Sequence, residues 1–410
     1  MTRASRVPFD IAIAGGGPAG TFAAILLRRS GARVALVDAG TPAMRVEGLA
    51  PRVAALLGAH GLPADGVSPP TRRRARWGAM DAAPNAEHLV ERGAFDAEGV
   101  AVIEGVVAGV APGAIALRGG RTVRAGLAVE ARGRRAPAPR SARRGPATLA
   151  VAGMTGPDRG QGAAIIACPE GWIWRADLPG RGRWGQVVLD AAAARSGLGA
   201  AWARMMRDAG EDAPFPDAPR IRAAELRLTA PELDPALPRI GDAAAAMDPL
   251  SGHGMFWALS SALALGPVID AIAAGRADIA QRFHRDRVAA TFLRQARIGR
   301  DFHRLVDAHA DAPFWAPRRA WPDDAPAHRA VAAPRRGARV TVENGRLTEV
   351  RPVGPILDRL GAGAPRRADF PAAIIPDAPE AEALAIHDWL VARDALGPLS
   401  HDTFLPEETC

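Results

Sequence analysis

Three glycines near the N-terminus have the spacing of a loop that binds a dinucleotide. Gly15, Gly17 and Gly20 directly follow the apolar run 9–14 and open a segment with helical periodicity. In such a loop the first glycine makes the tight turn, the second lets the backbone approach the phosphates, and the third lets helix and strand pack closely. The free N–H groups of the helix start, around Ala19, carry the partial positive charge that binds a pyrophosphate.

Asp38 lies in the next apolar segment, residues 33–40, and follows Gly20 by 18 positions. A carboxylate about 20 residues after the glycine loop binds the ribose hydroxyls of the nucleotide. These segments together predict one strand–helix–strand unit. Its spacing is compatible with FAD and with NAD, and does not choose between them.

A second set of motif residues lies much later in the chain. Ile240-Gly241-Asp242 precedes Asp248-Pro-Leu-Ser-Gly-His-Gly-Met255, which opens a long apolar segment predicted to be a helix. The N-terminus of a helix stabilises an anion such as a reduced flavin. Both segments resemble the late motifs of flavoprotein monooxygenases of the para-hydroxybenzoate hydroxylase fold. The resemblance implies that the cofactor is FAD and that its ribityl chain and isoalloxazine ring contact Asp242, Pro249, Gly252, Gly254 and Met255.

The same resemblance implies a role for three further side chains. Arg45 and Arg92 lie where related proteins carry arginines that contact the cofactor, although Val-Glu-Gly follows Arg45 in place of x-Gly-Glu-Ser. The alternative for each arginine is a surface salt bridge. His253 is the candidate catalytic residue, because it lies in the flavin-facing turn and imidazole exchanges protons near neutral pH. Its alternative is to satisfy the loop backbone. The segment 130–134, Glu-Ala-Arg-Gly-Arg, departs from the usual Asp-Ala-Thr-Gly-Arg.

Two tryptophans are candidates for the substrate side. Gly171-Trp172-Ile-Trp174, followed by Leu178-Pro179, resembles the Trp-x-Trp-x-Ile-Pro signature of flavin-dependent tryptophan halogenases. The alternative is one face of a buried strand, because side chains two positions apart point the same way. Halogenation requires a lysine that captures hypohalous acid, and the chain contains no lysine. The sequence therefore disfavours halogenation within this branch.

The motifs together resemble flavin monooxygenases that mature quinone cofactors, such as those acting on quinohemoprotein amine dehydrogenase. This resemblance implies hydroxylation of a tryptophan in the small subunit of an amine dehydrogenase, giving cysteine tryptophylquinone. A second glycine loop in a strand–helix context is missing, so NAD(P)H is expected to be a transient reductant. The alternatives are a small-molecule hydroxylase, a reductase of the geranylgeranyl reductase type, and a non-catalytic flavin-bound scaffold.

The composition limits the partners and the compartment. The net charge is +8 and every basic residue is arginine, which indicates either compositional drift or an acidic protein or peptide partner. Nucleic-acid motifs, a signal peptide and a membrane span are not apparent, so we expect a cytoplasmic protein that binds no nucleic acid. Cys168 and Cys410 are too few for a disulfide framework, and the nine histidines lack ligand spacing, so no metal site is expected.

The predicted fold class is α/β, with an interleaved Rossmann-like FAD domain and a β-sheet substrate lobe of α+β character. A loop is predicted over 64–76, a meander over 100–133, and a strand end, a loop and a long helix over 239–275. A further helix is predicted near 278–308, a hairpin turning at Asn344-Gly345, and an amphipathic helix over 379–397. The first part of the FAD domain is expected over 1–165, with a substrate-lobe excursion near 70–90, and its second part over 236–310. The substrate domain is expected between them, over 166–235. A linker over 311–337 and a small C-terminal domain over 338–410 are expected to follow.

Overall fold

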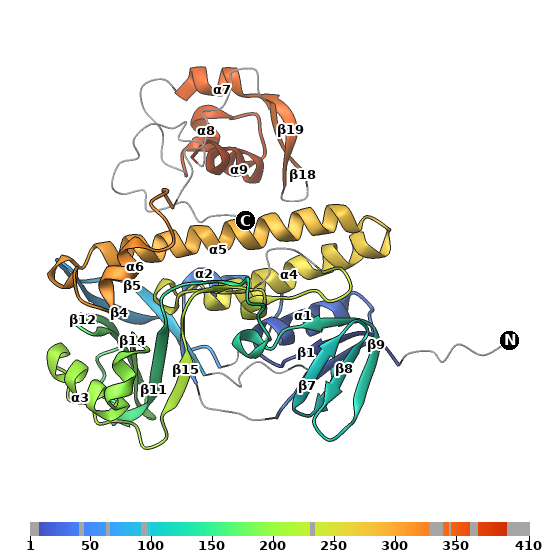
Figure 1. The fold of residues 1–410 in the computed structure, drawn as a ribbon. Helices are drawn as coiled ribbons and strands as arrows, with labels where there is room; N and C mark the ends of the chain where they lie inside the picture. Colours follow the sequence, from blue (N-terminus) through green and yellow to red (C-terminus); the bar gives the residue numbers. More distant parts are fainter. Residues whose placement is uncertain are drawn as a thin grey trace. The chain divides into compact units, whose positions relative to one another are not determined.

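The computed structural model describes residues 8–40, 45–62, 66–91, 97, 99–229, 234–327, 339–343, 346–360 and 368–391. The chain divides into two compact units, Met1–Ala327 and His328–Cys410 (Figure 1). The first unit contains two large sheets and their covering helices, and the second is a small α/β unit. This arrangement confirms the predicted α/β class.

The first large sheet has six strands in the order β6-β2-β1-β9-β8-β7. The strands β1, β2, β6 and β9 are parallel, and β7 and β8 extend the sheet as an antiparallel hairpin. The apolar runs of the central strands β1 and β2 are buried on both faces, as is typical of parallel sheets. The predicted strand–helix–strand unit is confirmed. The predicted meander is confirmed for β7, β8 and β9, whereas β6 lies at the opposite edge of the sheet and pairs parallel with β2. The bounds are β1 (Phe9–Ala14), β2 (Val34–Asp38), β6 (Ala101–Glu104), β7 (Val107–Ala111), β8 (Ala114–Leu117) and β9 (Thr122–Glu130).

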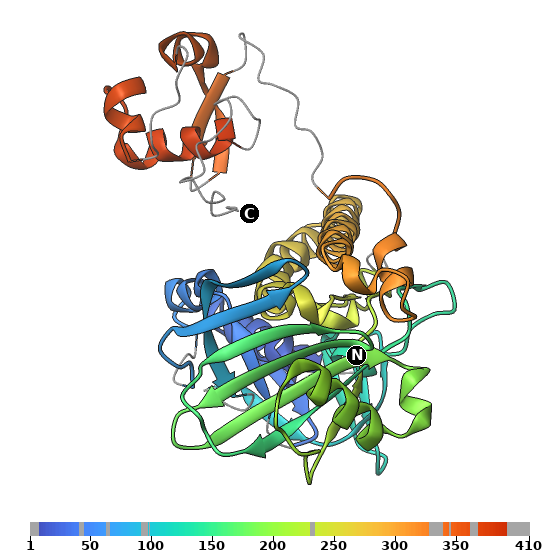
Figure 2. The same ribbon diagram turned by 90° about the vertical axis from the view of Figure 1, so that its left-hand side faces the viewer.

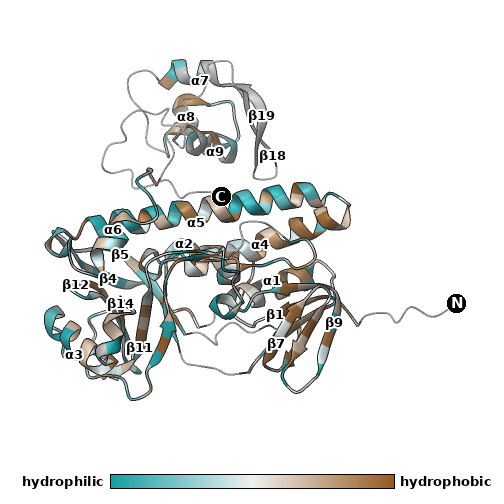
Figure 3. Cartoon of the chain, viewed as in Figure 1, coloured by the Kyte–Doolittle hydropathy of each residue, from teal (hydrophilic) through white to brown (hydrophobic). Residues whose placement is uncertain are grey.

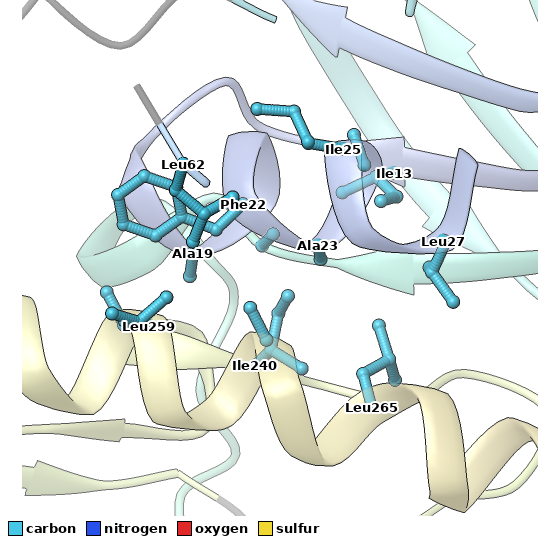
Figure 4. Packing of buried hydrophobic residues seen from close by; sticks show 14 of the residues in the cluster. Ile13, Ala19, Phe22, Ala23, Ile25, Leu27, Leu62, Ile240, Leu259 and Leu265 are labelled. Atoms are coloured by element: carbon cyan, nitrogen blue, oxygen red, sulfur yellow. The ribbon is translucent and has the colours of Figure 1, made fainter. Parts of the chain in front are cut away.

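Three helices pack on one another in succession beside this sheet. Helix α1 (Pro18–Arg29) packs on α4 (Gly254–Ala273), and α4 packs on α5 (Ala277–Arg304). Figure 4 shows Phe22 of α1 facing Leu259 of α4. By length and hydropathy alone α4 is able to cross a membrane, but one such helix is weak evidence. Its contribution to the buried core explains the same composition.

The second large sheet has eight strands in the order β15-β11-β14-β13-β12-β4-β5-β3. Figure 2 shows it from the side on which α3 lies. It extends beyond residues 166–235, because strands from 46–91 and 148–156 pair within it. The bounds are β3 (Val46–Leu49), β4 (Thr71–Trp77), β5 (Met80–Glu91), β11 (Thr148–Gly156), β12 (Ala163–Cys168), β13 (Gly171–Leu178), β14 (Gly182–Asp190), β15 (Arg220–Ala223) and α3 (Leu198–Ala209).

The prediction of a loop over 64–76 is wrong from Thr71 onward, because β4 begins there. Its sequence, Thr-Arg-Arg-Arg-Ala-Arg-Trp, looks too polar for a strand. Burial nevertheless rises at every second residue, and Ala75 and Trp77 enter the core. Pairing with β12 and β5 on its two edges places this arginine-rich segment inside the sheet.

The expected linker over 311–337 is wrong for its first part. Helix α6 (Trp315–Ala320) lies in this segment, and Trp315 is fully buried in the first unit. Its indole Nε1 donates a hydrogen bond of 2.9 Å to the backbone oxygen of Cys168. The remaining elements of this unit are α2 (Pro51–Ala59) and a three-stranded sheet of β10 (Arg143–Arg144), β16 (Arg227–Leu228) and β17 (Ala245–Ala246).

The second unit contains the predicted hairpin and C-terminal helix. Strands β18 (Arg339–Glu343) and β19 (Arg346–Pro352) pair antiparallel, while the turn Asn344-Gly345 lies outside the described residues. The apolar side chains of three helices form one buried cluster. Figure 3 shows hydrophilic and hydrophobic residues mixed along α5 of the first unit. The helices are α7 (Val353–Leu360), α8 (Phe370–Ile374) and α9 (Glu380–Val391).

We predict that Trp315→Ala lowers the free energy of unfolding by about 3–5 kcal/mol, because it removes a fully buried indole and its hydrogen bond. Leu305→Ala, at a half-exposed position nearby, serves as the control and should change it by less than about 0.5 kcal/mol. Urea unfolding followed by circular dichroism measures both. Equal midpoints for the two variants would mean that the 311–327 segment does not stabilise the first unit.

Candidate active site

The glycine turn between β1 and α1 is closed by backbone contacts that exclude side chains. Gly15 has a φ of +114°, and a Cβ there would lie 2.6 Å from the oxygen of Ala131, the residue directly after β9. A Cβ on Gly20 would collide with the backbone oxygen of Gly15, so only glycine lets α1 start here. Gly17 differs, because among the described residues no atom lies within 4 Å of its Cβ position. The turn is therefore tight at its base and open at the helix start.

Asp38 lies at the carboxyl end of β2, beside this turn. Its carboxylate carbon lies 2.6 Å from the position that a Cβ on Gly16 would take, and its Oδ1 accepts a hydrogen bond from Ala39 N. Gly16 is thus required by the carboxylate and was missed in the sequence analysis. The run of three consecutive glycines was the signal that pointed to it.

The second motif meets the first at Ala19. Gly241 has a φ of +56°, and a Cβ there would lie 2.7 Å from the Cβ of Ala19. The Gly241 N–H donates a hydrogen bond of 3.0 Å to Ser261 Oγ of α4. Residues separated by more than 200 positions therefore lie together at the N-terminus of α1. Gly241 and the adjacent Asp242 therefore lie near this helix start, and the contact of Asp242 with the ribityl chain stays a prediction.

Arg134 holds the two late motif segments in place. Its Nε lies 3.3 Å from Asp242 Oδ2, and its Nη2 donates a hydrogen bond of 2.8 Å to the Met247 oxygen. A further hydrogen bond from Nη1 reaches the Glu225 oxygen. Sequence analysis noted the Gly-Arg pair at this strand end but assigned no role to Arg134.

The segment 130–134, which differs from the usual Asp-Ala-Thr-Gly-Arg, contains an internal ion pair. Glu130 is buried, and Arg132 binds both of its oxygens, with Nη2 to Oε2 at 2.6 Å and Nε to Oε1 at 3.0 Å. A buried carboxylate needs such a partner, because desolvation of an isolated charge is costly. The two departures from the usual pattern are therefore linked, because Arg132, in place of threonine, neutralises Glu130, in place of aspartate.

The turn before α4 is shaped by a cap and a glycine. Asp248 accepts a hydrogen bond of 2.9 Å from Leu250 N and so caps the single helical turn Pro249–Ser251. Gly252 follows with a φ of +63°, which reverses the chain before His253. Among the described residues, nothing lies within 4 Å of the Cβ position of Gly252 or of Gly254. The backbone is open here, as it is at Gly17, whereas Met255 is buried.

The predicted arginine contacts are not established by the structure. Arg45 lies 3.9 Å from Glu47 at the start of β3, so the salt bridge of the alternative interpretation is present. Arg92 lies outside the described residues. Both cofactor contacts remain predictions.

Trp172 and Trp174 lie on the same face of β13, in a buried cluster that also contains Trp77, Trp184 and Trp315. The neighbouring side chain Ile173 faces the opposite cluster, below α3. Leu250, from the turn before α4, packs against the tryptophan cluster. The two tryptophans therefore form one face of a buried strand, and this position does not exclude their predicted place on the substrate side.

Glu87 lies behind Trp174 and was missed in the sequence analysis. Its Oε1 accepts a hydrogen bond of 3.0 Å from Trp174 Nε1, and Arg73 lies 3.7 Å from Oε2. Burial raises the pKa of Glu87 above its usual value of 4.5, although Arg73 and Trp174 oppose the shift. A Cβ on Gly48 would collide with this carboxylate.

Comparison with known structures places the chain among flavoenzymes. One similar structure is that of the peptidyl tryptophan dihydroxylase QhpG, essential for tryptophylquinone cofactor biogenesis. Its sequence is 31% identical to this chain and its TM-score is 0.72, and the match covers 96% of this chain and 100% of that chain. This chain belongs to the QhpG family. No protein-family model and no curated protein matches it.

The fold of this chain is also similar to that of flavin-dependent halogenases. CmlS is 22% identical with a TM-score of 0.63, over 78% of this chain and 69% of that chain. BrvH from Brevundimonas sp. BAL3 is 18% identical with a TM-score of 0.60, over 84% and 87%. At these identities the likeness concerns the fold alone, and the choice between hydroxylation and halogenation rests on the QhpG family and on the missing lysine.

We predict a pH-dependent difference in stability between this protein and its Glu87→Gln variant. The raised folded-state pKa means that the folded protein binds the proton more tightly than the unfolded chain. Stability therefore falls as pH rises from about 4.5 through the raised pKa. Glutamine keeps an acceptor for Trp174 Nε1 without titrating, so the variant should lose this part of the pH dependence.

Urea unfolding from pH 4 to 8 measures this effect as the wild-type minus variant difference in unfolding free energy. Asp81→Asn is the control, because Asp81 is an exposed carboxylate of the same strand, β5, with a lowered pKa. Its wild-type minus variant difference should rise with pH, and only at the acidic end of the range. A constant wild-type minus Glu87→Gln difference would contradict the raised pKa.

Proposed function

We propose that this chain is an FAD-dependent monooxygenase that hydroxylates a tryptophan residue of a partner polypeptide. The product serves the biogenesis of a tryptophan-derived quinone cofactor, cysteine tryptophylquinone, in the small subunit of an amine dehydrogenase. The observation that carries this proposal is the match to QhpG over 96% of the chain at 31% identity. NAD(P)H is the transient reductant and O2 the oxygen source. The reaction takes place in the cytoplasm, where NAD(P)H is available.

The residues of the first unit fit FAD. Gly17, Gly252 and Gly254 leave backbone open at two helix N-termini, where a Cβ would meet no described atom. Helix N-termini bind anions, so α1 suits the pyrophosphate and α4 suits the isoalloxazine. In this proposal Asp38 would bind the ribose and Asp242 the ribityl chain. Bound FAD supplies the activation of oxygen, which amino-acid side chains do not provide.

The second large sheet supplies the substrate side of the site. Trp172, Trp174 and the turn residue Leu250 belong to one apolar cluster, so this part of the site excludes water. Aromatic faces stack with an indole ring. Indole is electron-rich, so the chain has to orient the ring and keep water out, and needs no strong base to activate it.

An arginine-rich segment supports the proposal of an acidic partner. Residues 131–157 contain six arginines and no acidic residue. Arg135 and Arg140 are exposed, and among the described residues neither has a carboxylate partner within 4.0 Å. Arg227 is buried beside this segment, and burial together with the charges of Arg144 and Arg134 lowers its pKa. Such an excess of positive charge attracts acidic segments.

The function is tested with purified protein, FAD, NAD(P)H, O2 and a tryptophan-bearing small-subunit polypeptide. The expected product carries one or two added oxygen atoms on tryptophan, located by tandem mass spectrometry. An unchanged polypeptide with productive turnover of a small aromatic substrate would favour a small-molecule hydroxylase. Saturation of an isoprenoid would favour a reductase, and no turnover with any substrate would favour a scaffold.

We predict that Gly17→Ala weakens FAD binding while the protein stays folded. The new methyl group would meet no protein atom among the described residues but would occupy the space left for the pyrophosphate. The change in unfolding free energy should be about 1 kcal/mol or less, because glycine is exchanged at an N-cap. Titration of apo-protein with FAD, followed by flavin fluorescence, measures the loss.

The matched variant is Gly20→Ala, which forces α1 away from Gly15 and should lower stability and FAD binding together. Unchanged FAD affinity in Gly17→Ala would place the pyrophosphate elsewhere.

We also predict that the double variant Arg135→Gln, Arg140→Gln binds the polypeptide substrate more weakly and with a smaller dependence on salt. Screening reduces attraction between exposed charges. The control is Arg282→Gln, Arg285→Gln on α5, where both arginines already pair with aspartates. Equal KM values for the two double variants across a salt series would exclude the segment as the docking site.

A further inference from the structure

Arg52 and His253 form a pair that connects helix α2 to the start of α4. The guanidinium Nη2 of Arg52 donates a hydrogen bond to Nε2 of His253, across 201 positions of sequence. Both ends are anchored, because Val53 and Leu57 of α2 enter the same buried cluster as Met255 of α4. The pair therefore lies at the turn that carries Gly252 and Gly254.

The hydrogen bond determines where the imidazole proton lies. A guanidinium group only donates hydrogen bonds and keeps its charge at every pH that a folded protein tolerates. Nε2 of His253 must then carry a lone pair, so the ring is neutral and its proton is on Nδ1. With a proton on Nε2, two N–H donors would face each other. In the doubly protonated imidazolium, two positive charges would face each other as well.

Phe256 completes the arrangement one helical turn after His253. Its ring lies nearly perpendicular to the imidazole, with centroids 6.3 Å apart and an interplanar angle of 84°. Arg52 Cζ lies 5.0 Å from the Phe256 ring centroid, within the range of a cation–π interaction. Two independent contacts thus hold the guanidinium where it meets Nε2.

We propose that Arg52 is a positioning residue that keeps His253 neutral, with its proton on Nδ1, and places a permanent positive charge beside the N-terminus of α4. The second part rests on the proposed function, because it concerns the anionic reduced flavin. His253 then acts as a hydrogen-bond donor through Nδ1. The charge that complements the flavin anion comes from Arg52 and the helix N-terminus, and His253 does not supply it as a proton-shuttling imidazolium.

The protonation state is tested by nitrogen NMR on apo-protein labelled with 15N-histidine. The chemical shifts of the two ring nitrogens distinguish a nitrogen that carries a proton from one that carries a lone pair. The signals that disappear in His253→Ala identify His253. We expect a protonated Nδ1 and an unprotonated Nε2 at neutral pH. A protonated Nε2, or a charged ring, would overturn the proposal.

Two substitutions separate the hydrogen bond from the charge. Arg52→Gln retains an N–H donor and should preserve the Nδ1-protonated form, whereas Arg52→Ala should shift the population toward protonation at Nε2. Arg33→Ala, which removes an exposed arginine paired with Asp10, is the control and should leave the His253 signals unchanged. Unaltered His253 shifts in Arg52→Ala would also overturn the proposal.

The charge is tested in the FAD-loaded protein by its reduction potential. Both Arg52→Gln and Arg52→Ala should make the potential more negative than in the wild type or Arg33→Ala, because the reduced flavin loses a neighbouring cation. A potential that stays at the wild-type value in both would refute this part. The NMR result does not depend on cofactor or substrate, so a failure of the proposed function leaves it interpretable.

Discussion

The contact between Gly20 and the backbone oxygen of Gly15 determines where α1 lies on the first large sheet. No side chain fits there, so the helix starts directly on the turn that follows β1. With α1 in this place, α4 packs along it, and Gly241 comes against Ala19. The two motif segments of the site, which are separated by more than 200 positions, meet through these close approaches. A larger side chain at any of them would separate the segments.

The second large sheet joins this framework through aromatic packing. Trp172 and Trp174 share a buried cluster with Trp315 of α6, and Leu250 connects that cluster to the turn before α4. A rigid apolar wall therefore adjoins the polar helix start. This combination suits oxygen transfer, because charge has to be stabilised on one side of the site while water is kept from the other.

Arginine performs the tasks that a mixed set of basic residues usually shares. Arg132 neutralises the buried Glu130, Arg134 links Asp242 to Met247, and Arg52 meets His253. The planar guanidinium suits all three, because it donates several hydrogen bonds in fixed directions and retains its charge. Arg135 and Arg140 remain exposed, and the net charge of +8 is therefore partly available to a partner.

The glycine turn, the strand–helix–strand unit, the helix that begins after Gly252 and the final hairpin were determined by the sequence itself. Each depends on neighbours within about 20 residues, where backbone preference and hydrophobic periodicity act directly. The tertiary structure alone decided that the arginine-rich segment from Thr71 forms a strand, that Trp315 is buried, and that Gly16 meets Asp38. It also decided that Arg52 meets His253 and that Glu87 meets Trp174. These outcomes depend on which distant surfaces pack together, and local sequence carries little information about a contact that forms across 87 or 201 positions.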